Sequence, residues 1–356
     1  HGFFFPPSPG SAEACQVGGM VATNASGMRA VKYGATRDYV LGLTFVRADG
    51  EIVECGTHTI KDASGYQLAR LMCGSEGTLG IITQITFKLT TKPKKSASCL
   101  CGFDSVVAAG SCISAMIARP LIPASCELMD EVSITAVNKA LSNPLPDVNS
   151  LIIVEVDGET DEVIQRDLKI VEEVAKEQHA VSVTPSFDSA QIAKWTNARK
   201  SVLASLSVLL PGHVSVSLAD DMGVPVSKVP EAVAAFQRIA KKYDVTVATY
   251  GHASDGNLHT KMVLDPTDKD EWDRGVAAVS EIFDVCVELG GTVTGEHGVG
   301  ISKALSFQKE RASELSSIMA IKQAMDPENI LNPGKAAQWR GSMLTHLRYP
   351  CQEYMD

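Results

Sequence analysis

The sequence predicts a two-domain α+β protein, and three observations support this prediction. The chain has 356 residues, more than one hydrophobic core ordinarily serves. Residues 1–91 combine glycine-rich loops with β-branched runs, whereas the chain beyond them alternates helical and strand patterns. The polar stretch Lys92–Ser96 separates the two regions and is the predicted boundary. We therefore expect domains at residues 1–91 and 92–335, followed by an unstructured tail at 336–356.

The first region predicts a hairpin, a short helix and a further strand. Val40–Ala48 and Glu51–Cys55 are rich in β-branched and apolar residues, and the turn pair Asp49-Gly50 separates them. A helix is expected at Tyr66–Met72, and an alternating strand at Ile81–Leu89.

The second region predicts seven helices and seven strands from its periodicity and its turn residues. The expected helices are Ser105–Ala118, Glu131–Leu141, Thr160–His179, Ser189–Leu206, Val229–Tyr243, Lys269–Leu289 and Ser306–Met325. The expected strands are Pro123–Met129, Ser150–Val156, Val181–Thr184, Val214–Leu218, Thr246–Gly251, Leu258–Leu264 and Gly291–Thr294.

Composition excludes several classes of function. The chain is 45% hydrophobic and 21% charged, which is typical of a globular protein, and its net charge of −10 without a basic stripe argues against a nucleic-acid partner. No apolar run is long enough to predict a transmembrane segment. The nine cysteines are odd in number and form no CxxC pair, which favours reduced thiols over disulfides or an iron–sulfur site. We expect a cytoplasmic protein, or one peripheral to the inner face of the membrane.

Three loops within the first 80 residues place small residues close together. They are Gly18-Gly19, Asn24–Gly27 and the GxxGxxG segment Gly74–Gly80. Such loops supply positive φ angles and free backbone N–H groups. Each alone is compatible with a tight turn in a β-rich domain, whereas the three together favour a dinucleotide-binding surface.

Asp255-Gly256 predicts a two-residue hairpin turn. In that register His252 lies opposite His259, with Cβ atoms roughly 4.5–5.5 Å apart. Two imidazoles on one face can share a metal ion, and a carboxylate such as Glu296 would complete the ligand set. We expect Asp255 to shape the turn; structural or surface histidines are the alternative.

Glu296 and His297 lie between glycines after the predicted strand Gly291–Thr294. Loops that follow strands commonly carry active sites in α/β sheets. We expect Glu296 to be the third metal ligand and His297, turned away from it, to be a general base. Asn257 is placed to direct a hydrogen bond at a ligand. The alternative for the glycine-flanked pair is a turn with two solvated polar side chains.

Arg199 is a candidate clamp for a substrate carboxylate, because its planar guanidinium suits bidentate binding. An exposed charge on a helix explains the same residue equally well, so both interpretations stay open.

Together these segments resemble the FAD-linked oxidases of the vanillyl-alcohol oxidase type. The resemblance is greatest to the branch of D-lactate dehydrogenases, glycolate oxidase catalytic subunits and D-2-hydroxyglutarate dehydrogenases. It covers residues 1 to about 335. Besides the two histidine motifs, it is carried by Pro6–Ser11, Val17–Gly27, Lys32–Val40, Gly74–Gly80 and Asp326–Lys335.

The resemblance implies the C-terminal part of a VAO/PCMH-type FAD-binding domain, followed by an antiparallel-sheet cap domain with flanking helices. It also implies that the chain is N-terminally truncated, because the family's glycine-rich pyrophosphate loop would precede His1. The residues that it places along the FAD are Gly18, Gly19, Asn24, Ser26, Gly27, Gly77, Thr78, Gly80, Ile81 and Asn332.

The implied reaction is the metal-assisted oxidation of a D-2-hydroxy acid to the 2-oxo acid, with hydride transfer to the flavin N5. His252, His259 and Glu296 would bind the metal, Arg199 the substrate carboxylate, and His297 would take the hydroxyl proton. Zinc is the first choice of metal, with manganese or iron as alternatives. An iron–sulfur subunit, a quinone or an electron-transfer protein would accept the electrons.

The resemblance favours D-lactate as substrate, with glycolate as the second choice. Leu203 stands where the D-2-hydroxyglutarate branch has a polar substrate contact. Two other functions stay open at this point. One is a metal-dependent hydrolase in which Glu296 or His297 activates water. The other is an inactive fragment that retains only metal or partner binding.

Overall fold

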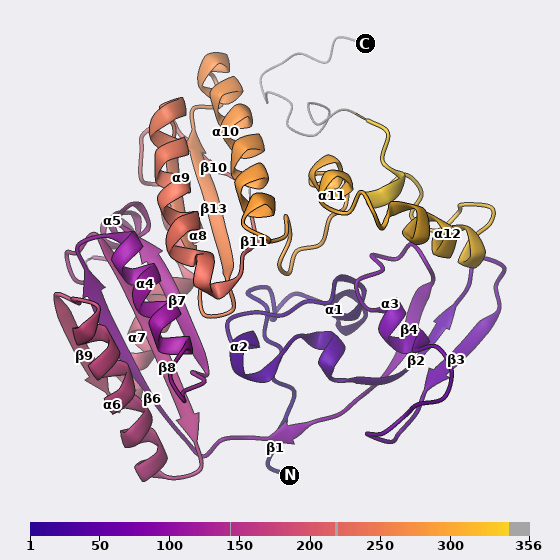
Figure 1. Ribbon diagram of the computed structural model, residues 1–356, viewed down its shortest axis with the longest axis horizontal. Helices are drawn as coiled ribbons and strands as arrows, with labels where there is room; N and C mark the ends of the chain where they lie inside the picture. Colours follow the sequence, from indigo (N-terminus) through magenta and orange to yellow (C-terminus); the bar gives the residue numbers. More distant parts are fainter. Residues whose placement is uncertain (143, 218–219, 342–356) are drawn as a thin grey trace. The chain divides into compact units, whose positions relative to one another are not determined.

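The computed structural model describes residues 1–142, 144–217 and 220–341, and the chain divides into two compact units. The first unit comprises His1–Lys92 and the described residues from Thr294 onward. The second runs from Pro93 to Val293 (Figure 1). The segment after Thr294, which the sequence analysis assigned to the second domain, therefore groups with the N-terminal residues.

A three-stranded antiparallel sheet forms the centre of the first unit. Its order is β3-β2-β4, with β2 at Val40–Val46, β3 at Ile52–Gly56 and β4 at Ile81–Phe87. The predicted hairpin and the strand after the glycine loop are therefore confirmed. Phe45 of β2 is 1% exposed and packs with Met72 of α3 (Leu68–Met72).

Short helices and strands complete the first unit, and the buried Lys322 connects its own helix and the segment after it to the glycine loop. The remaining elements are β1 (Phe3–Phe4), α1 (Val17–Thr23), α2 (Ala30–Tyr33), η1 (Thr36–Asp38), β5 (Thr90–Thr91), α11 (Ala304–Glu310), α12 (Leu315–Met325) and η3 (Ala336–Gln338). Lys322 of α12 donates to the carbonyls of Thr78 at 2.9 Å and Leu331 at 2.8 Å, and it pairs with Asp326. These bonds hold the segment after α12 against the glycine loop.

The second unit is built on an antiparallel sheet with the order β10-β13-β12-β7-β8-β6-β9, in which β11 pairs with β13. The strands are β6 (Lys95–Phe103), β7 (Ser125–Asp130), β8 (Ser150–Gly158), β9 (Ser182–Ser186), β10 (Val214–Val216), β11 (Met222–Gly223), β12 (Thr246–Gly251) and β13 (Asn257–Leu264). This arrangement confirms the expected antiparallel-sheet domain.

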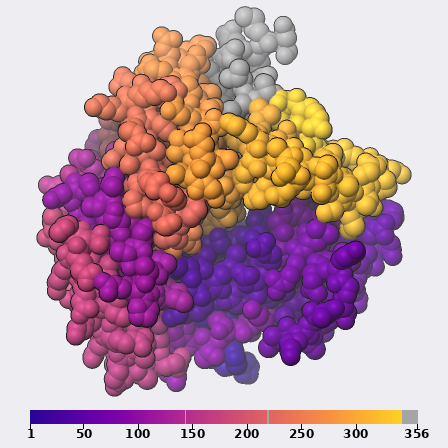
Figure 2. All heavy atoms as spheres, in the orientation of Figure 1, coloured from indigo at the N-terminus to yellow at the C-terminus, as the bar shows by residue number. Residues whose placement is uncertain are grey.

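Helices cover both faces of this sheet. One layer contains α4 (Val106–Ile117), α6 (Asp161–Glu177), α9 (Val229–Tyr243) and α10 (Lys269–Glu288). Within this layer α4 packs against α6 and α9, and α9 packs against α10. Side chains of this layer form much of the second unit's surface in Figure 2. The other layer contains α5 (Glu131–Ala140), α7 (Ser189–Lys200) and α8 (Val202–Leu206).

The layer of α5, α7 and α8 encloses a core that reaches the proposed site. Trp195 of α7 and Val202 of α8 pack with Met129 of β7, Tyr250 of β12 and Val263 of β13, and each is at most 5% exposed. Polar side chains that belong to the same face of the sheet are therefore held among rigid apolar neighbours.

Several elements differ from the sequence-based expectation. Two predicted helices are interrupted, at Ser201 between α7 and α8 and between α11 and α12. The strand β6 was not predicted. Gly291–Thr294 forms no strand, because it makes only an isolated bridge between Thr292 and Gly223. The predicted strand ending at Leu218 extends to a residue outside the described part of the chain.

The expectation of an unstructured tail after Lys335 is wrong for its first residues. The Ala336 N–H group donates to the carbonyl of Gly300 at 2.7 Å. The Gln308 side chain of α11 donates to the carbonyls of Ala336 and Trp339 at 3.0 Å each. Residues 342–356 lie outside the described part of the chain.

Candidate functional site

The histidine hairpin exists, but its register differs from the prediction. Tyr250 of β12, not His252, lies opposite His259 of β13. The His252 carbonyl accepts the N–H groups of Asp255 at 3.1 Å and Asn257 at 3.3 Å, which closes a turn wider than two residues. Gly256 adopts φ +83° in this turn, and a Cβ there would lie 1.8 Å from the Val224 carbonyl oxygen. The predicted two-residue turn, and with it the direct pairing of the histidines, is therefore wrong.

The two imidazoles nevertheless lie together. Their ring centroids are 5.3 Å apart at an interplanar angle of 88°. On its other side β12 pairs with β7, where Tyr250 faces Met129 and Gly251 faces Leu128. Continuing this register by one residue brings His252 to Glu127, and Nδ1 of His252 lies 2.7 Å from Oε1 of Glu127.

His259 has a carboxylate partner of the same kind. Its Nδ1 lies 3.2 Å from Oδ1 of Asp220, whose other oxygen pairs with the buried Lys261. An ionised carboxylate only accepts hydrogen bonds, so Nδ1 of each histidine is the donor, and in a neutral ring Nε2 is then the nitrogen that can bind a metal. Metal-binding histidines commonly have this arrangement. The donor pair therefore fits a divalent metal of the zinc type.

Arg199 is buried, which contradicts its interpretation as an exposed helix charge. The residue is 7% exposed, its Nε lies 2.7 Å from Oε2 of Glu127, and its guanidinium carbon lies 4.7 Å from the Tyr250 ring centroid. Burial alone would raise the pKa of Glu127, but His252 and Arg199 outweigh it and lower that pKa. Glu127 is thus a carboxylate held ionised between two cationic or proton-donating groups.

Two buried oxygens near the turn have no hydrogen-bond partner among the described residues. They are Oγ of Ser254 and Oδ1 of Asn257. The amide nitrogen of Asn257 already donates to Oδ1 of Asp221 at 2.8 Å and to the Met222 carbonyl at 3.2 Å. Leaving such atoms unpaired costs about 1–3 kcal/mol each. Both oxygens are available to accept a hydrogen bond from a polar ligand, and the ligand contact expected of Asn257 stays a prediction.

Glu296 and His297 belong to the first unit, where a hydroxyl holds the carboxylate. Oγ of Ser26 donates to Oε2 of Glu296 at 3.3 Å, and Nε2 of His297 lies 3.6 Å from Oε1 of Glu296. The expectation that His297 turns away from Glu296 is therefore wrong. The His297 side chain is 48% exposed, whereas that of Glu296 is 7% exposed. Their grouping with the histidine pair stays a prediction.

The loops expected to line FAD adopt the left-handed backbone at some positions and not at others. Asn24 has φ 53°, Gly27 φ 112°, Gly77 φ 70° and Asn332 φ 45°. Gly18 and Gly19, in contrast, lie inside helix α1, so they do not supply the positive φ angles that the sequence suggested. Because they have no side chain, another group can still approach the backbone of that helix closely.

The glycine loop itself presents polar and apolar groups suited to a cofactor. Oγ of Ser75 is buried without a hydrogen-bond partner among the described residues, whereas Ile81 is 59% exposed. The side chains of Thr78 and Asn332 are used internally, donating to the Ser75 carbonyl at 2.7 Å and the Glu76 carbonyl at 2.6 Å. An unpaired hydroxyl within the loop and an exposed apolar side chain directly after it in the sequence fit a ligand such as FAD, with both polar and aromatic parts.

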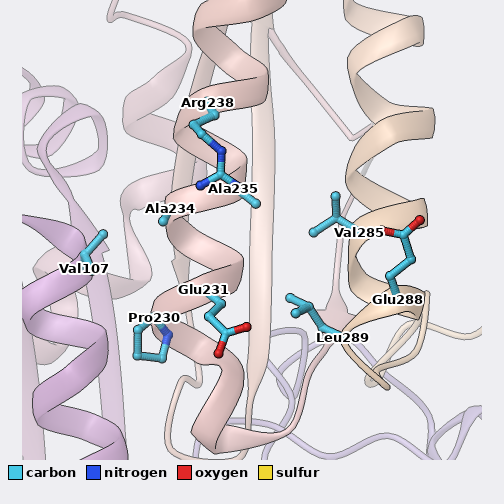
Figure 3. A pocket seen from close by; sticks show the side chains of 9 residues that line it. All are labelled: Val107, Pro230, Glu231, Ala234, Ala235, Arg238, Val285, Glu288 and Leu289. Carbon is cyan, nitrogen blue, oxygen red and sulfur yellow. The ribbon is translucent and has the colours of Figure 1, made fainter.

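A separate groove of about 500 Å³ lies in the second unit between α4, α9 and α10. Figure 3 shows Val107, Arg238 and Leu289 among its lining side chains, none of which is a candidate site residue.

Leu203, which bears on substrate choice, is 50% exposed on α8. Among the described residues, no helix is both long and apolar enough to cross a membrane.

The matching protein families and the similar proteins agree on one family for this chain. A family described as FAD linked oxidases, C-terminal domain, matches residues 92–336, and an FAD binding domain matches residues 1–56. The glycolate oxidase subunit GlcD of Bacillus subtilis (strain 168) is 40% identical over 336 residues, covering 94% of this chain and 70% of that protein. The mitochondrial D-lactate dehydrogenase [cytochrome] of Arabidopsis thaliana is 33% identical, covering 94% and 58%.

A solved structure of p-cresol methylhydroxylase with substrate bound has a TM-score of 0.68 at 16% identity, covering 94% of this chain and 71% of that one. This likeness shows the VAO/PCMH-type fold. The chain spans 58% to 70% of the length of the two curated relatives described above.

Proposed function

Because this chain belongs to the family of FAD-linked oxidases, we propose that it oxidises a D-2-hydroxy acid to the 2-oxo acid with bound FAD and a divalent metal. The observation that carries the proposal is the pair His252 and His259, whose Nδ1 atoms both face buried carboxylates. Relatives named for glycolate and D-lactate support the class of substrate. A metal-dependent hydrolase fits less well, since both matching families are FAD-linked.

His252 and His259 would bind the metal through Nε2, and Glu296 would be the third ligand. Zinc is the proposed metal, because two imidazoles and a carboxylate leave a position open for substrate in catalytic zinc sites. When bound, FAD supplies the hydride acceptor, and the metal polarises the hydroxyl and carboxylate oxygens of the substrate.

The chain's own residues bind the substrate and accept its proton. Arg199 binds the substrate carboxylate through its terminal nitrogens, because its Nε is already held by Glu127. His297 takes the proton of the substrate hydroxyl, for which its half-exposed ring is accessible. Oδ1 of Asn257 accepts a hydrogen bond from the bound ligand.

We propose D-lactate as the preferred substrate and glycolate as the second. An apolar Leu203 one turn after Arg199 offers no hydrogen bond to a second carboxylate. The electrons would pass from the flavin to an external acceptor such as an iron–sulfur subunit, a quinone or an electron-transfer protein.

The test is the visible absorbance of the purified flavoprotein under anaerobic conditions. D-Lactate is expected to bleach the flavin bands in the wild type and in a His58→Ala control, since His58 is exposed and remote in sequence from the motifs. A His297→Ala variant should keep the flavin spectrum and lose the bleaching. A protein without a flavin spectrum, or with bleaching unaffected by His297→Ala, would contradict the proposal.

A further inference from the structure

One buried carboxylate contacts both a proposed metal ligand and the proposed substrate clamp. Glu127 of β7 is 2% exposed. Its Oε1 lies 2.7 Å from Nδ1 of His252, and its Oε2 lies 2.7 Å from Nε of Arg199. Each oxygen therefore has its own partner, and the two partners come from different elements, the end of β12 and helix α7.

The surroundings leave Glu127 little freedom to move. Its neighbour along the same face of β7, Met129, lies in the apolar core, and the Arg199 guanidinium stacks on the Tyr250 ring. Removing one partner of a buried charged network leaves the others unpaired, which is strongly unfavourable. The orientation of His252 and that of Arg199 are thus fixed by the same group.

We propose that Glu127 is a positioning residue, which presents Nε2 of His252 to the metal and holds Arg199 for the substrate carboxylate. This inference rests on the proposed function. It deepens that function, because the Glu127 side chain would couple the binding of the metal to the binding of the substrate carboxylate. Glu127 itself would contact neither the metal nor the substrate.

The second histidine supports this assignment independently. Asp220 contacts Nδ1 of His259 and pairs with Lys261, whose Nζ also donates to Oγ of Ser217 at 2.5 Å. Both imidazoles therefore have a buried carboxylate behind Nδ1, and each carboxylate also pairs with a buried cationic side chain. Glu127 differs from Asp220 because its cation is the proposed substrate clamp.

Replacing Glu127 by Gln keeps the volume but cannot keep both contacts. A glutamine amide has one accepting oxygen and one donating nitrogen. If the oxygen accepts from His252, the NH₂ group faces the cationic guanidinium of Arg199, and the reverse orientation leaves His252 facing a donor. Glu127→Gln therefore leaves one of the two groups without its partner in either orientation of the amide, and because the amide adopts both orientations, both contacts are weakened on average.

The first measurement is the affinity for Co²⁺ of protein stripped of metal, followed by calorimetry and by the visible spectrum of the bound ion. Glu127→Gln should weaken Co²⁺ binding about 10- to 100-fold. The matched control is Asp167→Asn, which removes the carboxylate of another arginine pair, that with Arg166 on α6. It should leave Co²⁺ affinity unchanged. Equal affinity in the wild type and Glu127→Gln, or an equal loss in Asp167→Asn, would overturn the proposal.

A second measurement can already decide the question on the wild type alone. Nitrogen-15 NMR of the histidine rings in the metal-free wild type should show His252 protonated at Nδ1, because an ionised Glu127 accepts that proton. In Glu127→Gln the population of this tautomer should fall. A wild type in which His252 carries its proton on Nε2 would overturn the proposal even if the variant failed to fold.

Kinetics with D-lactate separate this inference from the proposed function. Because Arg199 loses its support, Glu127→Gln should raise KM about 10-fold or more at saturating metal, a loss of about 1.4 kcal/mol in substrate binding. An unchanged KM would overturn the substrate half of the proposal. If the wild type does not oxidise D-lactate, the proposed function fails, whereas the Co²⁺ and NMR results still decide the role of Glu127.

Discussion

The carboxylate of Glu76 accepts the backbone N–H group of Gly300 at 2.7 Å, although the two residues are 224 positions apart in the sequence. The other carboxylate oxygen accepts the N–H group of Val299, also at 2.7 Å. Both ends of this contact are glycine-rich loops of the first unit. The loop proposed to line FAD therefore also holds the loop that carries Glu296 and His297.

Replacing Glu76 by Ala should release this second loop. Hydrogen bonds to a charged acceptor contribute about 1.5–3 kcal/mol each, so the Val299 and Gly300 amides should exchange with solvent at least about 10-fold faster. Hydrogen–deuterium exchange with mass spectrometry measures this, with Glu54→Ala on the exposed side of β3 as the control. Unchanged protection of both amides would show that Glu76 does not hold the loop.

His252→Ala and His259→Ala should each abolish tight binding of Zn²⁺ by the metal-free protein. Each removes one nitrogen of the proposed ligand set and leaves its carboxylate partner, Glu127 or Asp220, without the imidazole. The control is His58→Ala, which should bind one equivalent as the wild type does. Full zinc binding by His252→Ala would refute its assignment as a ligand.

Buried thiols should resist alkylation in the native protein. Burial raises the pKa of Cys112 and of Cys286 to about 12, and that of Cys73 to about 11. Since the thiolate is the reactive form, iodoacetamide at about pH 8 should label the partly exposed Cys15 well before Cys112 or Cys286. Peptide mass spectrometry at timed intervals gives the order, and urea should remove the difference. Early labelling of Cys286 in the folded protein would contradict its burial.

Asp130 should make stability depend on pH in a defined direction. Burial raises its pKa from 3.8 to about 6, although Ser133 and the Thr249 N–H group donate to it. The folded state therefore binds the proton more tightly than the unfolded state. This stabilisation is fully present below about pH 4 and is lost as the pH rises through about 6.

The unfolding free energy of the wild type, taken relative to that of Asp130→Asn, should accordingly fall by about 2 kcal/mol between pH 4 and pH 6, since each pKa unit corresponds to about 1.4 kcal/mol. Urea unfolding of both proteins across this range measures it. Parallel pH profiles would mean that Asp130 has the same pKa in both states.

Elements with a clear local signal could be predicted from the sequence. The helix Val229–Tyr243 and the strand Thr246–Gly251 have the predicted bounds, because Pro230 marks the helix start and the strand is a short apolar run. Strand β6 was missed because it begins with polar residues at the predicted boundary, and because Ala97–Phe103 is buried on both faces and shows no alternation.

The candidate site could likewise be predicted from the sequence only in part. The histidine motifs are contiguous and were visible, but the register of their hairpin is set by pairing with β7 and by Gly256 against Val224, which no local pattern encodes. Glu127 and Asp220 were missed for the same reason. Glu127 is 125 residues from His252, and in the sequence it is simply one charged residue within an apolar strand.

The most direct test of the proposed chemistry is the rate at which D-lactate reduces the bound flavin without oxygen, before and after metal is restored. Stripping the metal should slow reduction at least about 100-fold in the wild type, because a bound divalent ion lowers the pKa of the hydroxyl that His297 is proposed to deprotonate. One equivalent of Zn²⁺ should restore the rate in the wild type and in Asp167→Asn, but not in His252→Ala. An equally fast reduction in the metal-free wild type would contradict a metal-assisted oxidation.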